Sequence, residues 1–263
     1  MKLEDKIVFL GTAGARIAVF KQIRASGGIW ITLEGVNLLI DPGPGCLVRC
    51  VQSRVRLDPT KLDAIILTHE HLDHSADVNV MIEAMTEGGF KKRGILFAPR
   101  TALEDEPVVF KYVRDYVEEI IVLKEHGVYP LRGIKINTPV KHKHGKETYG
   151  LNIISDKLTI SYITDTKFFP ELLKHYKGHI LIINVVRRYE TKELEHMSLE
   201  EAKEIIRVNQ PDLAILTHFG MTMLRANPQR LAEEVSKETG VKVIAAKDGM
   251  AIDLNEYKKE RRV

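Results

Sequence analysis

A short apolar segment runs directly into a cluster of histidine and aspartate residues, and this junction constrains the fold more than any other part of the chain. Residues 64–67 read Ala-Ile-Ile-Leu, as expected for a buried strand, and the pattern His-x-His-x-Asp-His follows one residue later. Side chains at a strand end alternate in direction, so His69 and His71 can hold one ion. Asp73 and His74 lie on the turn beyond, where they can reach a second ion ~3.5–4 Å from the first. The pattern predicts a sheet with a metal site at its edge.

The composition is that of a globular protein with a sizeable core. The chain has 263 residues, of which 44% are hydrophobic and 29% charged, and this excludes a disordered chain. No uncharged apolar run approaches the ~18 residues that span a bilayer, and the apolar run after Lys6 is too short for a signal peptide. We therefore expect a soluble, cytoplasmic protein with no membrane partner. The chain has only 8 Asn and 4 Gln, a bias typical of thermophile proteins.

Charge and cysteine content exclude two further classes of protein. The formal net charge of +3 is spread along the chain, and the basic clusters at residues 91–93, 187–188 and 258–262 are short. We interpret them as solvated surface, because an electrostatic nucleic-acid binder usually carries a basic stripe. Two cysteines cannot form a disulfide framework. The i, i+4 spacing of Cys46 and Cys50 places both on one helix face, which favours packing over redox chemistry.

The periodicity of the chain predicts an α/β protein with mixed sheets and helices outside them. Short β-branched runs predict strands, and 3.6-residue periodicity predicts helices at 76–85, 108–117, 199–208 and 229–239. Ser198 and Glu201 form a capping box, and Gly240 closes the last long helix. Two similar halves, each strand-rich first and βα later, are expected to form one domain over residues 1–263. The predicted strands are 6–10, 28–33, 37–40, 64–67, 95–97, 119–122, 134–137, 151–155, 159–163, 180–184, 213–217, 241–245 and 251–253.

Other predicted strands also end on potential metal ligands. Asp165 directly follows an apolar strand, and His218 follows another in a second Leu-Thr-His segment. His142 and His144 lie in the Lys-His-Lys-His-Gly segment before a further strand. A lone His after a strand is usually a surface residue, but several strand ends of this kind predict a ring of ligands at one edge of the fold.

These motifs resemble those of the metallo-β-lactamase fold superfamily over nearly the whole chain. The resemblance implies a four-layer αβ/βα sandwich with two mixed sheets and the site along one edge. It also implies that Asp41, in Leu-Ile-Asp-Pro-Gly, lies behind the ligands and fixes a His tautomer by hydrogen bonding. His144 is expected as a ligand in preference to His142. Asp165 is expected to be the carboxylate that bridges the two ions. The implied set for two metal ions is His69, His71, Asp73, His74, His144, Asp165 and His218.

Within the superfamily, the chain resembles the ribonuclease Z and cyclic phosphodiesterase branch. The opening Phe-Leu-Gly-Thr-Ala and the His-Gly-x-x-x-Tyr-Gly segment at residues 144–150 carry this likeness. His196 lies before a predicted helix, where the branch has a His that contacts the scissile phosphate; the alternative is an ordinary surface His. The chain departs from bacterial ribonuclease Z because only 21 residues separate His144 from Asp165, which leaves no room for a tRNA-gripping arm. Intact tRNA is therefore a doubtful substrate.

The expected activity is that of a dinuclear metal-dependent hydrolase, a phosphodiesterase or nuclease acting on a small or single-stranded phosphodiester. A metal-bridging hydroxide would attack phosphorus, with Asp73 orienting it and His196 protonating the leaving oxygen. Zn²⁺ suits the ligands, and Mn²⁺ or Fe also fits them. The alternative is a thioesterase or lactonase of the glyoxalase II kind on the same metals. A non-catalytic metal-dependent scaffold is a third possible function. The sequence leaves the oligomeric state open, with a homodimer as one candidate. Basic residues that can hold a phosphate, or else lie on the surface, are Arg16, Arg24 and Arg187.

Overall fold

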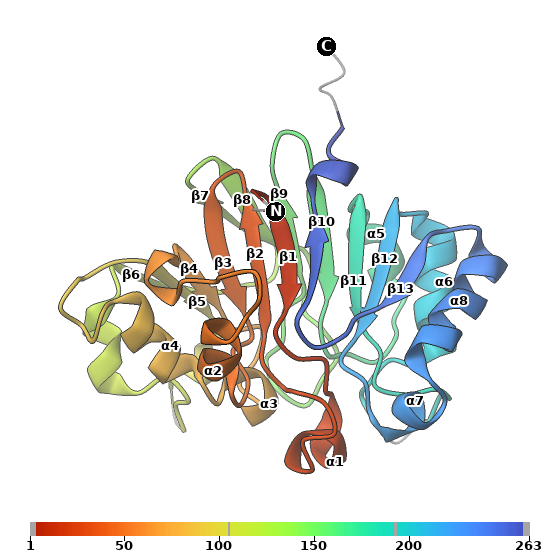
Figure 1. The fold of residues 1–263 in the computed structure, drawn as a ribbon, viewed down its shortest axis with the longest axis horizontal. Coiled ribbons are helices and arrows are strands. Elements are labelled where there is room, and N and C mark those ends of the chain that lie inside the picture. The colour runs from red at the N-terminus through yellow and green to blue at the C-terminus, as the bar shows by residue number, and fades with distance from the viewer. Residues whose placement is uncertain (1–3, 105, 192–193, 260–263) are drawn as a thin grey trace. The chain divides into compact units, whose positions relative to one another are not determined.

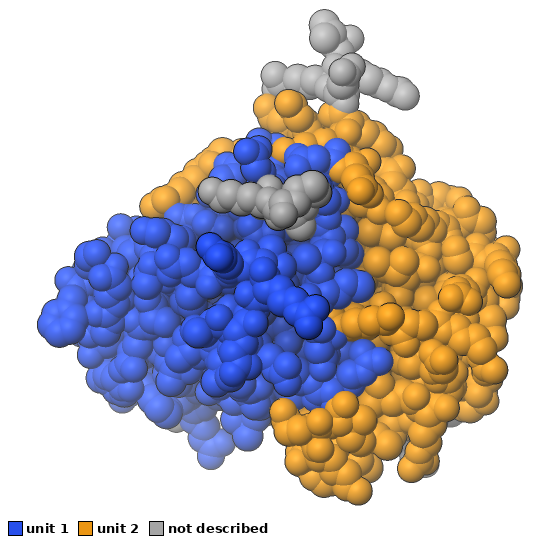
Figure 2. Space-filling view, in the orientation of Figure 1, with its two compact units in different colours: residues 1–12, 24–124, 248–255 blue, residues 13–23, 125–247, 256–263 orange. Residues whose placement is uncertain are grey.

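The computed structural model describes residues 4–104, 106–191 and 194–259, and these fall into two compact units (Figure 2). Unit 1 comprises residues 1–12, 24–124 and 248–255, and unit 2 comprises residues 13–23, 125–247 and 256–263. Each unit contains one of the two sheets. The single domain over residues 1–263 stays a prediction.

The sheet of unit 1 has seven strands in the order β14-β1-β2-β3-β4-β5-β6 (Figure 1). β14, β1, β2 and β3 pair in antiparallel fashion, and β3, β4, β5 and β6 pair in parallel. The parallel strands bring their carboxyl ends to one edge, which is where the His-x-His-x-Asp-His segment begins after β4. The strands are β1 (Lys6–Phe9), β2 (Ile29–Leu33), β3 (Val36–Ile40), β4 (Ala64–Ile66), β5 (Ile95–Ala98), β6 (Glu119–Val122) and β14 (Met250–Asp253).

The sheet of unit 2 repeats this plan, with the order β13-β12-β11-β10-β9-β8-β7. β7, β8, β9 and β10 form an antiparallel meander, and β10, β11, β12 and β13 are parallel. Asp165 and His218 follow two of the parallel strands, β10 and β12. The strands are β7 (Gly127–Leu131), β8 (Ile134–Thr138), β9 (Leu151–Ile154), β10 (Thr159–Ile163), β11 (Ile180–Asn184), β12 (Leu213–Thr217) and β13 (Val243–Ala245).

Helices complete the core of each unit. In unit 1, α2 (Cys46–Val51) follows β3, and α3 (Leu72–Ser75) and α4 (Val78–Met85) follow β4 in succession. α2 and α4 contribute buried residues to the core of this sheet. Cys46 and Cys50 are both buried on α2, as the spacing predicted. Unit 2 contains α1 (Ala15–Phe20), α5 (Leu172–His175), α6 (Leu199–Asn209), α7 (Met221–Arg225) and α8 (Pro228–Thr239), and Figure 1 shows α6 and α8 beside β12 and β13. The short 3₁₀ turns are Pro59–Lys61, Arg100–Ala102, Lys111–Tyr116 and Asn255–Tyr257.

The predicted fold class is confirmed, since two mixed sheets with flanking helices are present. Each predicted strand has a counterpart whose ends agree to within two residues. The capping box of Ser198 and Glu201 is present at α6, and Gly240 ends α8 at φ 74°. None of the helices in the described part of the chain is long and apolar enough to cross a membrane.

The helix predicted at residues 108–117 is wrong, because only a 3₁₀ helix forms, at Lys111–Tyr116. Backbone groups that would start an α-helix are bonded elsewhere. The amide of Asn79 donates to the carbonyl of Val108, and its oxygen accepts from the N–H of Phe110. The strand β7 was missed for a different reason: it contains Pro130, which is tolerated because β7 lies at the edge of its sheet.

Candidate metal centre

The ligand-rich segment of unit 1 leaves the sheet at the end of β4 and turns into α3. His69 and His74 are buried, and His71 is half-buried. The imidazoles lie together: the ring centroids of His69 and His74 are 4.1 Å apart, and Nε2 of His74 lies 3.9 Å from Oδ2 of Asp73. The strand-to-helix turn therefore gathers four donors from the six residues 69–74.

Asp41 lies behind these donors and orients them. It follows β3 and has a φ of 51°, a left-handed conformation that Asp tolerates better than most residues. Its Oδ1 accepts from the N–H of Thr68 at 2.7 Å, and its Oδ2 accepts from the Thr68 hydroxyl at 2.8 Å. The same Oδ2 lies 2.9 Å from Nδ1 of His74. An Nδ1–H directed at this carboxylate leaves the Nε2 of His74 as the donor atom for a metal.

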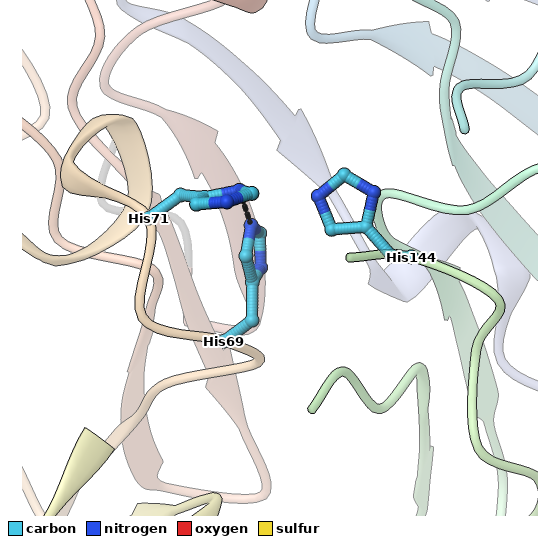
Figure 3. Close-up of side chains that lie close together, drawn as sticks. All are labelled: His69, His71 and His144. Atoms are coloured by element: carbon cyan, nitrogen blue, oxygen red, sulfur yellow. Dashed lines mark hydrogen bonds between the residues drawn. The ribbon is translucent and has the colours of Figure 1, made fainter. Parts of the chain in front are cut away.

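The pair His69 and His71 is spaced like two ligands of one ion. Nε2 of His69 lies 3.1 Å from Nδ1 of His71, and the rings stand nearly perpendicular (Figure 3). Two imidazole nitrogens bound to one ion at ~2.0–2.1 Å lie about 2.9–3.4 Å apart, depending on the angle at the metal. Nδ1 of His69 lies 3.1 Å from the Thr68 hydroxyl, which favours the tautomer with Nε2 available. The donor chemistry and spacing of this pair fit a divalent ion.

Unit 2 presents a second group of donors, centred on Asp165. This residue is buried directly beyond β10, and its Oδ1 lies 3.3 Å from Nε2 of His218, which follows β12. The amide of Asn184, at the end of β11, donates to the same oxygen at 2.8 Å. His218 has a φ of 60°, and Gly14 packs so closely that a Cβ there would lie 2.2 Å from the His218 carbonyl oxygen. Three neighbouring parallel strands thus fix one carboxylate and one imidazole.

The structure separates His142 from His144. His142 is 3% exposed, and its Nε2 lies 2.8 Å from the hydroxyl of Tyr176. Burial lowers the pKa of His142 to about 3, so this side chain is neutral. His144, also drawn in Figure 3, is half-buried and its Nδ1 lies 3.1 Å from the carbonyl oxygen of Glu195. His142 is a core residue in unit 2, whereas the imidazole of His144 is only partly buried.

His196 lies beside the donors of unit 2. Its Nδ1 is 3.5 Å from Oδ2 of Asp165, the oxygen that does not face His218. The ring centroids of His196 and His144 are 5.1 Å apart. The side chain is 20% exposed, so solvent reaches it. This position differs from that of an ordinary surface histidine.

The three arginines considered as phosphate contacts lie in different environments. Arg16 is exposed on α1. Arg24 is half-buried and donates to the hydroxyl of Thr12 at 3.0 Å. Arg187 donates to the hydroxyl of Thr191.

Two residues that hold the donors in place are not predicted from the sequence. Thr68 bonds both Asp41 and His69, and Asn184 bonds Asp165. Both are polar residues at or just beyond the end of an apolar parallel strand, which is the signal that identified the histidines. The His and Asp side chains that can hold a metal ion are His69, His71, Asp73 and His74 in unit 1, and His144, Asp165 and His218 in unit 2.

Comparisons with known proteins show the family of the chain. Residues 36–219 match the family model of the beta-lactamase superfamily domain. An uncharacterized protein of Methanocaldococcus jannaschii is 33% identical over 261 residues, which cover 95% of each chain. The ribonuclease Z of Methanopyrus kandleri is 26% identical over 280 residues, covering 93% of this chain and 96% of that protein.

Among solved structures, the metallo-β-lactamase fold protein YhfI from Bacillus subtilis superposes with a TM-score of 0.79. It is 21% identical, and the match covers 94% of this chain and 98% of the other. The likeness to YhfI shows that the chain has the metallo-β-lactamase fold. Because the family match covers more than half of the sequence, the chain belongs to the beta-lactamase superfamily.

Proposed function

We propose that this protein is a metal-dependent phosphodiesterase that holds two divalent ions and acts on a small or single-stranded phosphodiester. The observation that carries the proposal is the position of His196, with Nδ1 3.5 Å from Asp165 and its ring 5.1 Å from that of His144. An imidazole beside the ligands that is not itself needed as a ligand can act as the general acid that a poor alkoxide leaving group requires. The proposed ligands are His69, His71, Asp73, His74, His144, Asp165 and His218.

When bound, divalent ions supply Lewis-acid polarisation of the phosphoryl group and an acidified water. The residues of the chain have separate tasks around them. Asp41 and Thr68 fix the tautomers of His74 and His69, so that each presents its Nε2. Asp73, whose side chain is 20% exposed, can accept the proton of an attacking water. His196 can donate a proton to the leaving oxygen or a charged hydrogen bond to the phosphoryl oxygens.

The likeness to ribonuclease Z supports a phosphodiester as the reacting group. The relative from Methanopyrus kandleri bears this name and matches nearly the full length of the chain. The interval between His144 and Asp165 is occupied by the hairpin of β9 and β10. We therefore expect intact pre-tRNA to be a poor substrate compared with short oligonucleotides or small diesters. Efficient and accurate cleavage at the tRNA 3′ end would contradict this part of the proposal.

The first experiment is an activity screen of the protein reconstituted with Zn²⁺, Mn²⁺ or Fe²⁺. The substrates are bis-p-nitrophenyl phosphate, 2′,3′-cyclic nucleotides, single-stranded RNA, S-lactoylglutathione and a lactone. Metal analysis accompanies the screen, and we expect close to two ions per chain. A maximum of one ion after reconstitution would overturn the dinuclear site, and hydrolysis of only the thioester or lactone would overturn the phosphodiesterase.

The second experiment tests His196 directly. The variant His196→Ala should lower kcat on an alkyl phosphodiester by roughly 10²–10⁴-fold, the usual contribution of a general acid. Its metal content should be unchanged, and the loss should be smaller for a p-nitrophenolate leaving group, which needs little protonation. The variant His126→Asn is a matched control, since His126 is exposed and Asn tolerates its φ of 59°. Full activity of His196→Ala on the alkyl diester would refute the assignment, and loss of metal would make His196 a ligand.

A further inference from the structure

The chain makes an excursion between β1 and β2 that contains the short helix α1. Residues 13–23 belong to unit 2, whereas the segments on either side of them belong to unit 1. The N–H of Gly14 donates to the carbonyl of Phe219 at 3.1 Å, and Ala13 forms a β-bridge with Phe219. We call residues 13–23 the α1 excursion. Its first two residues thus lie directly beside the proposed ligand His218.

The contact between Gly14 and His218 is close and involves strained backbone. A Cβ at position 14 would lie 2.5 Å from Cδ2 of the His218 imidazole, so Gly14 covers one edge of this ring. Ala15 has a φ of 61° and His218 a φ of 60°, a conformation that costs energy for residues other than glycine. Residues keep such a conformation only where the surrounding structure holds them. The placement of the imidazole therefore depends on what holds the α1 excursion.

The helix α1 contributes little to holding the excursion. It has only six residues, its N-cap Gly14 makes no side-chain hydrogen bond, and Ala18 is its buried residue. The side chains of Ile17 and Phe20 are 48% and 68% exposed. A helix of this length is marginal by itself, because few hydrogen bonds offset the cost of starting it. The excursion is therefore held mainly at its ends.

One carboxylate joins the two ends of the α1 excursion. Oδ1 of Asp248 accepts from the hydroxyl of Thr12 at 2.7 Å, and its Oδ2 accepts from the N–H of Ala25 at 2.7 Å. The N–H of Thr12 donates to the carbonyl of Ala25 at 2.8 Å, and Arg24 donates to the Thr12 hydroxyl at 3.0 Å. Hydrogen bonds to an ionised carboxylate are stronger than those between neutral groups. Thr12 is buried, so water competes little for its bond to Asp248.

Asp248 is itself anchored to the strand that leads into the excursion. It lies between β13 and β14, and the N–H of its neighbour Gly249 donates to the carbonyl of Phe9 at 2.7 Å. Phe9 is the last residue of β1, three positions before Thr12. The carboxylate therefore has a fixed place from which to hold both ends of the α1 excursion.

We propose that Asp248 is a positioning residue: its carboxylate closes the α1 excursion and so holds Gly14 against the imidazole of His218. Loss of the carboxylate should release the ends of the excursion, and Gly14 with them, so that the edge of the imidazole becomes accessible. The inference rests on the proposed function only where it concerns metal binding, because the chain alone makes the closure.

The first experiment measures the reactivity of His218 in the metal-free protein. Diethyl pyrocarbonate modifies accessible imidazoles, and peptide mass spectrometry gives the rate for each histidine. His218 is 8% exposed, so we expect slow modification in the wild type and severalfold faster modification in Asp248→Ala. Asp248→Asn should resemble the wild type, because an amide can accept from the N–H of Ala25 and donate to the hydroxyl of Thr12. His142 is buried and should stay protected, which reports that unit 2 is folded.

Asp58→Ala is the matched control for the loss of an aspartate. The carboxylate of Asp58 also accepts from one N–H and one threonine hydroxyl, both of Thr60, at 3.0 and 2.8 Å. These bonds cap the 3₁₀ turn Pro59–Lys61 and involve no residue of the α1 excursion. We expect His218 in this variant to react at the wild-type rate.

The second experiment is a double-mutant cycle on Zn²⁺ affinity, measured by competition with a chromogenic chelator. Asp248→Ala should lower the affinity about 10-fold, as does the loss of a residue that orients a ligand. Because Asp248 acts through His218, adding Asp248→Ala to His218→Ala should cause no further loss. A residue with a merely structural role would weaken binding by the same factor in both backgrounds.

Two results would overturn the proposal: an unchanged rate for His218 in Asp248→Ala while His142 stays protected, or equal losses of affinity in the two backgrounds of the cycle. If Asp248→Ala also exposes His142, Thr12→Val decides, because it removes only one of the two bonds to the carboxylate. It should speed the modification of His218, and a wild-type rate would refute the closure. A wild type that binds no Zn²⁺ would refute the metal centre of the proposed function, and the metal-free experiment would still decide the role of Asp248.

Discussion

The buried imidazole of His142 should make this protein sensitive to mild acid. Burial in unit 2 lowers the pKa of this group from 6.5 to about 3, whereas the unfolded chain protonates it at its ordinary pKa. Between these two pKa values the unfolded state binds more protons. The stabilisation is therefore complete above pH 6.5 and is lost progressively as the pH falls toward 3.

The size of the effect follows from the pKa difference. A shift of about 3.5 units corresponds to about 5 kcal/mol in total, of which about 2 kcal/mol is lost between pH 7 and pH 5. The variant His142→Gln removes the titrating group and keeps an amide that can bond the hydroxyl of Tyr176. At pH 7 we expect the variant to be about 1–3 kcal/mol less stable, because the imidazole packs edge-on against Phe169 and Tyr176. This difference should shrink by about 2 kcal/mol at pH 5.

The assay is urea unfolding of the metal-free protein, followed by far-UV circular dichroism at several pH values from 7 to 5. A chelator is present throughout, so that metal release adds nothing to the pH dependence. All other ionisable groups are the same in both proteins and cancel in the difference between wild type and variant. His126→Asn serves as the exposed control for the loss of a histidine and should leave the unfolding free energy at pH 7 unchanged. A constant difference between wild type and His142→Gln would refute the reasoning, because it would mean that water reaches the imidazole.

Three further substitutions test individual contacts. Asn184→Leu removes the hydrogen bond to Asp165 and should lower metal affinity 10–100-fold in a competition assay with a chromogenic chelator, on the order expected for a residue that positions a ligand. Gly14→Ala places a Cβ 2.2 Å from the carbonyl oxygen of His218 and should lower both metal content and kcat, measured by elemental analysis and steady-state kinetics. Ser198→Ala removes the N-cap of α6 and should cost about 1 kcal/mol of unfolding free energy in urea.

For each of these variants, a control or a particular result can contradict the expected effect. Asn209→Ala is the control for Asn184, since its amide donates to the carbonyl of Tyr176; equal metal affinity in the two variants would be contrary to expectation. Gly35→Asn is the control for Gly14, because Gly35 has a φ of 79° and open space around it, and should keep its metal. Unchanged metal content in Gly14→Ala would show that the loop adapts. An unchanged urea midpoint for Ser198→Ala would mean that α6 is fixed by its buried face alone.

Local patterns in the sequence were sufficient to predict most elements and most candidate donors. A run such as Ala64 to Leu67 is apolar because a parallel strand is covered on both faces, and the first polar residue after it must lie where the strand leaves the core. This is why His69, Asp165 and His218 stand out without knowledge of the fold. The same reasoning would have selected Asn184, which ends β11, had amides been considered with the imidazoles and carboxylates.

Features that depend on contacts between distant segments needed the tertiary structure. The helix predicted at residues 108–117 is shortened because Asn79, about 30 positions earlier, takes the backbone groups that would begin it. The strand β7 contains Pro130, which is tolerated because β7 is the edge strand of its sheet, next to β8. Neither fact is visible in the local periodicity.

The choice between His142 and His144 shows the limit most directly. In a regular strand both side chains would point to the same face, so their spacing cannot distinguish them. The chain bends at residues 144–146, immediately after His142 has entered the core beside Tyr176. One imidazole is thereby buried and neutral, while the other is directed toward Glu195 and His196 at the surface of unit 2. The sequence determined the donor types and the strand ends. Packing between segments far apart in the chain decided which donors are buried in the core and which are not. The reason is that the desolvation of a side chain depends on all of its neighbours and not on the local pattern alone.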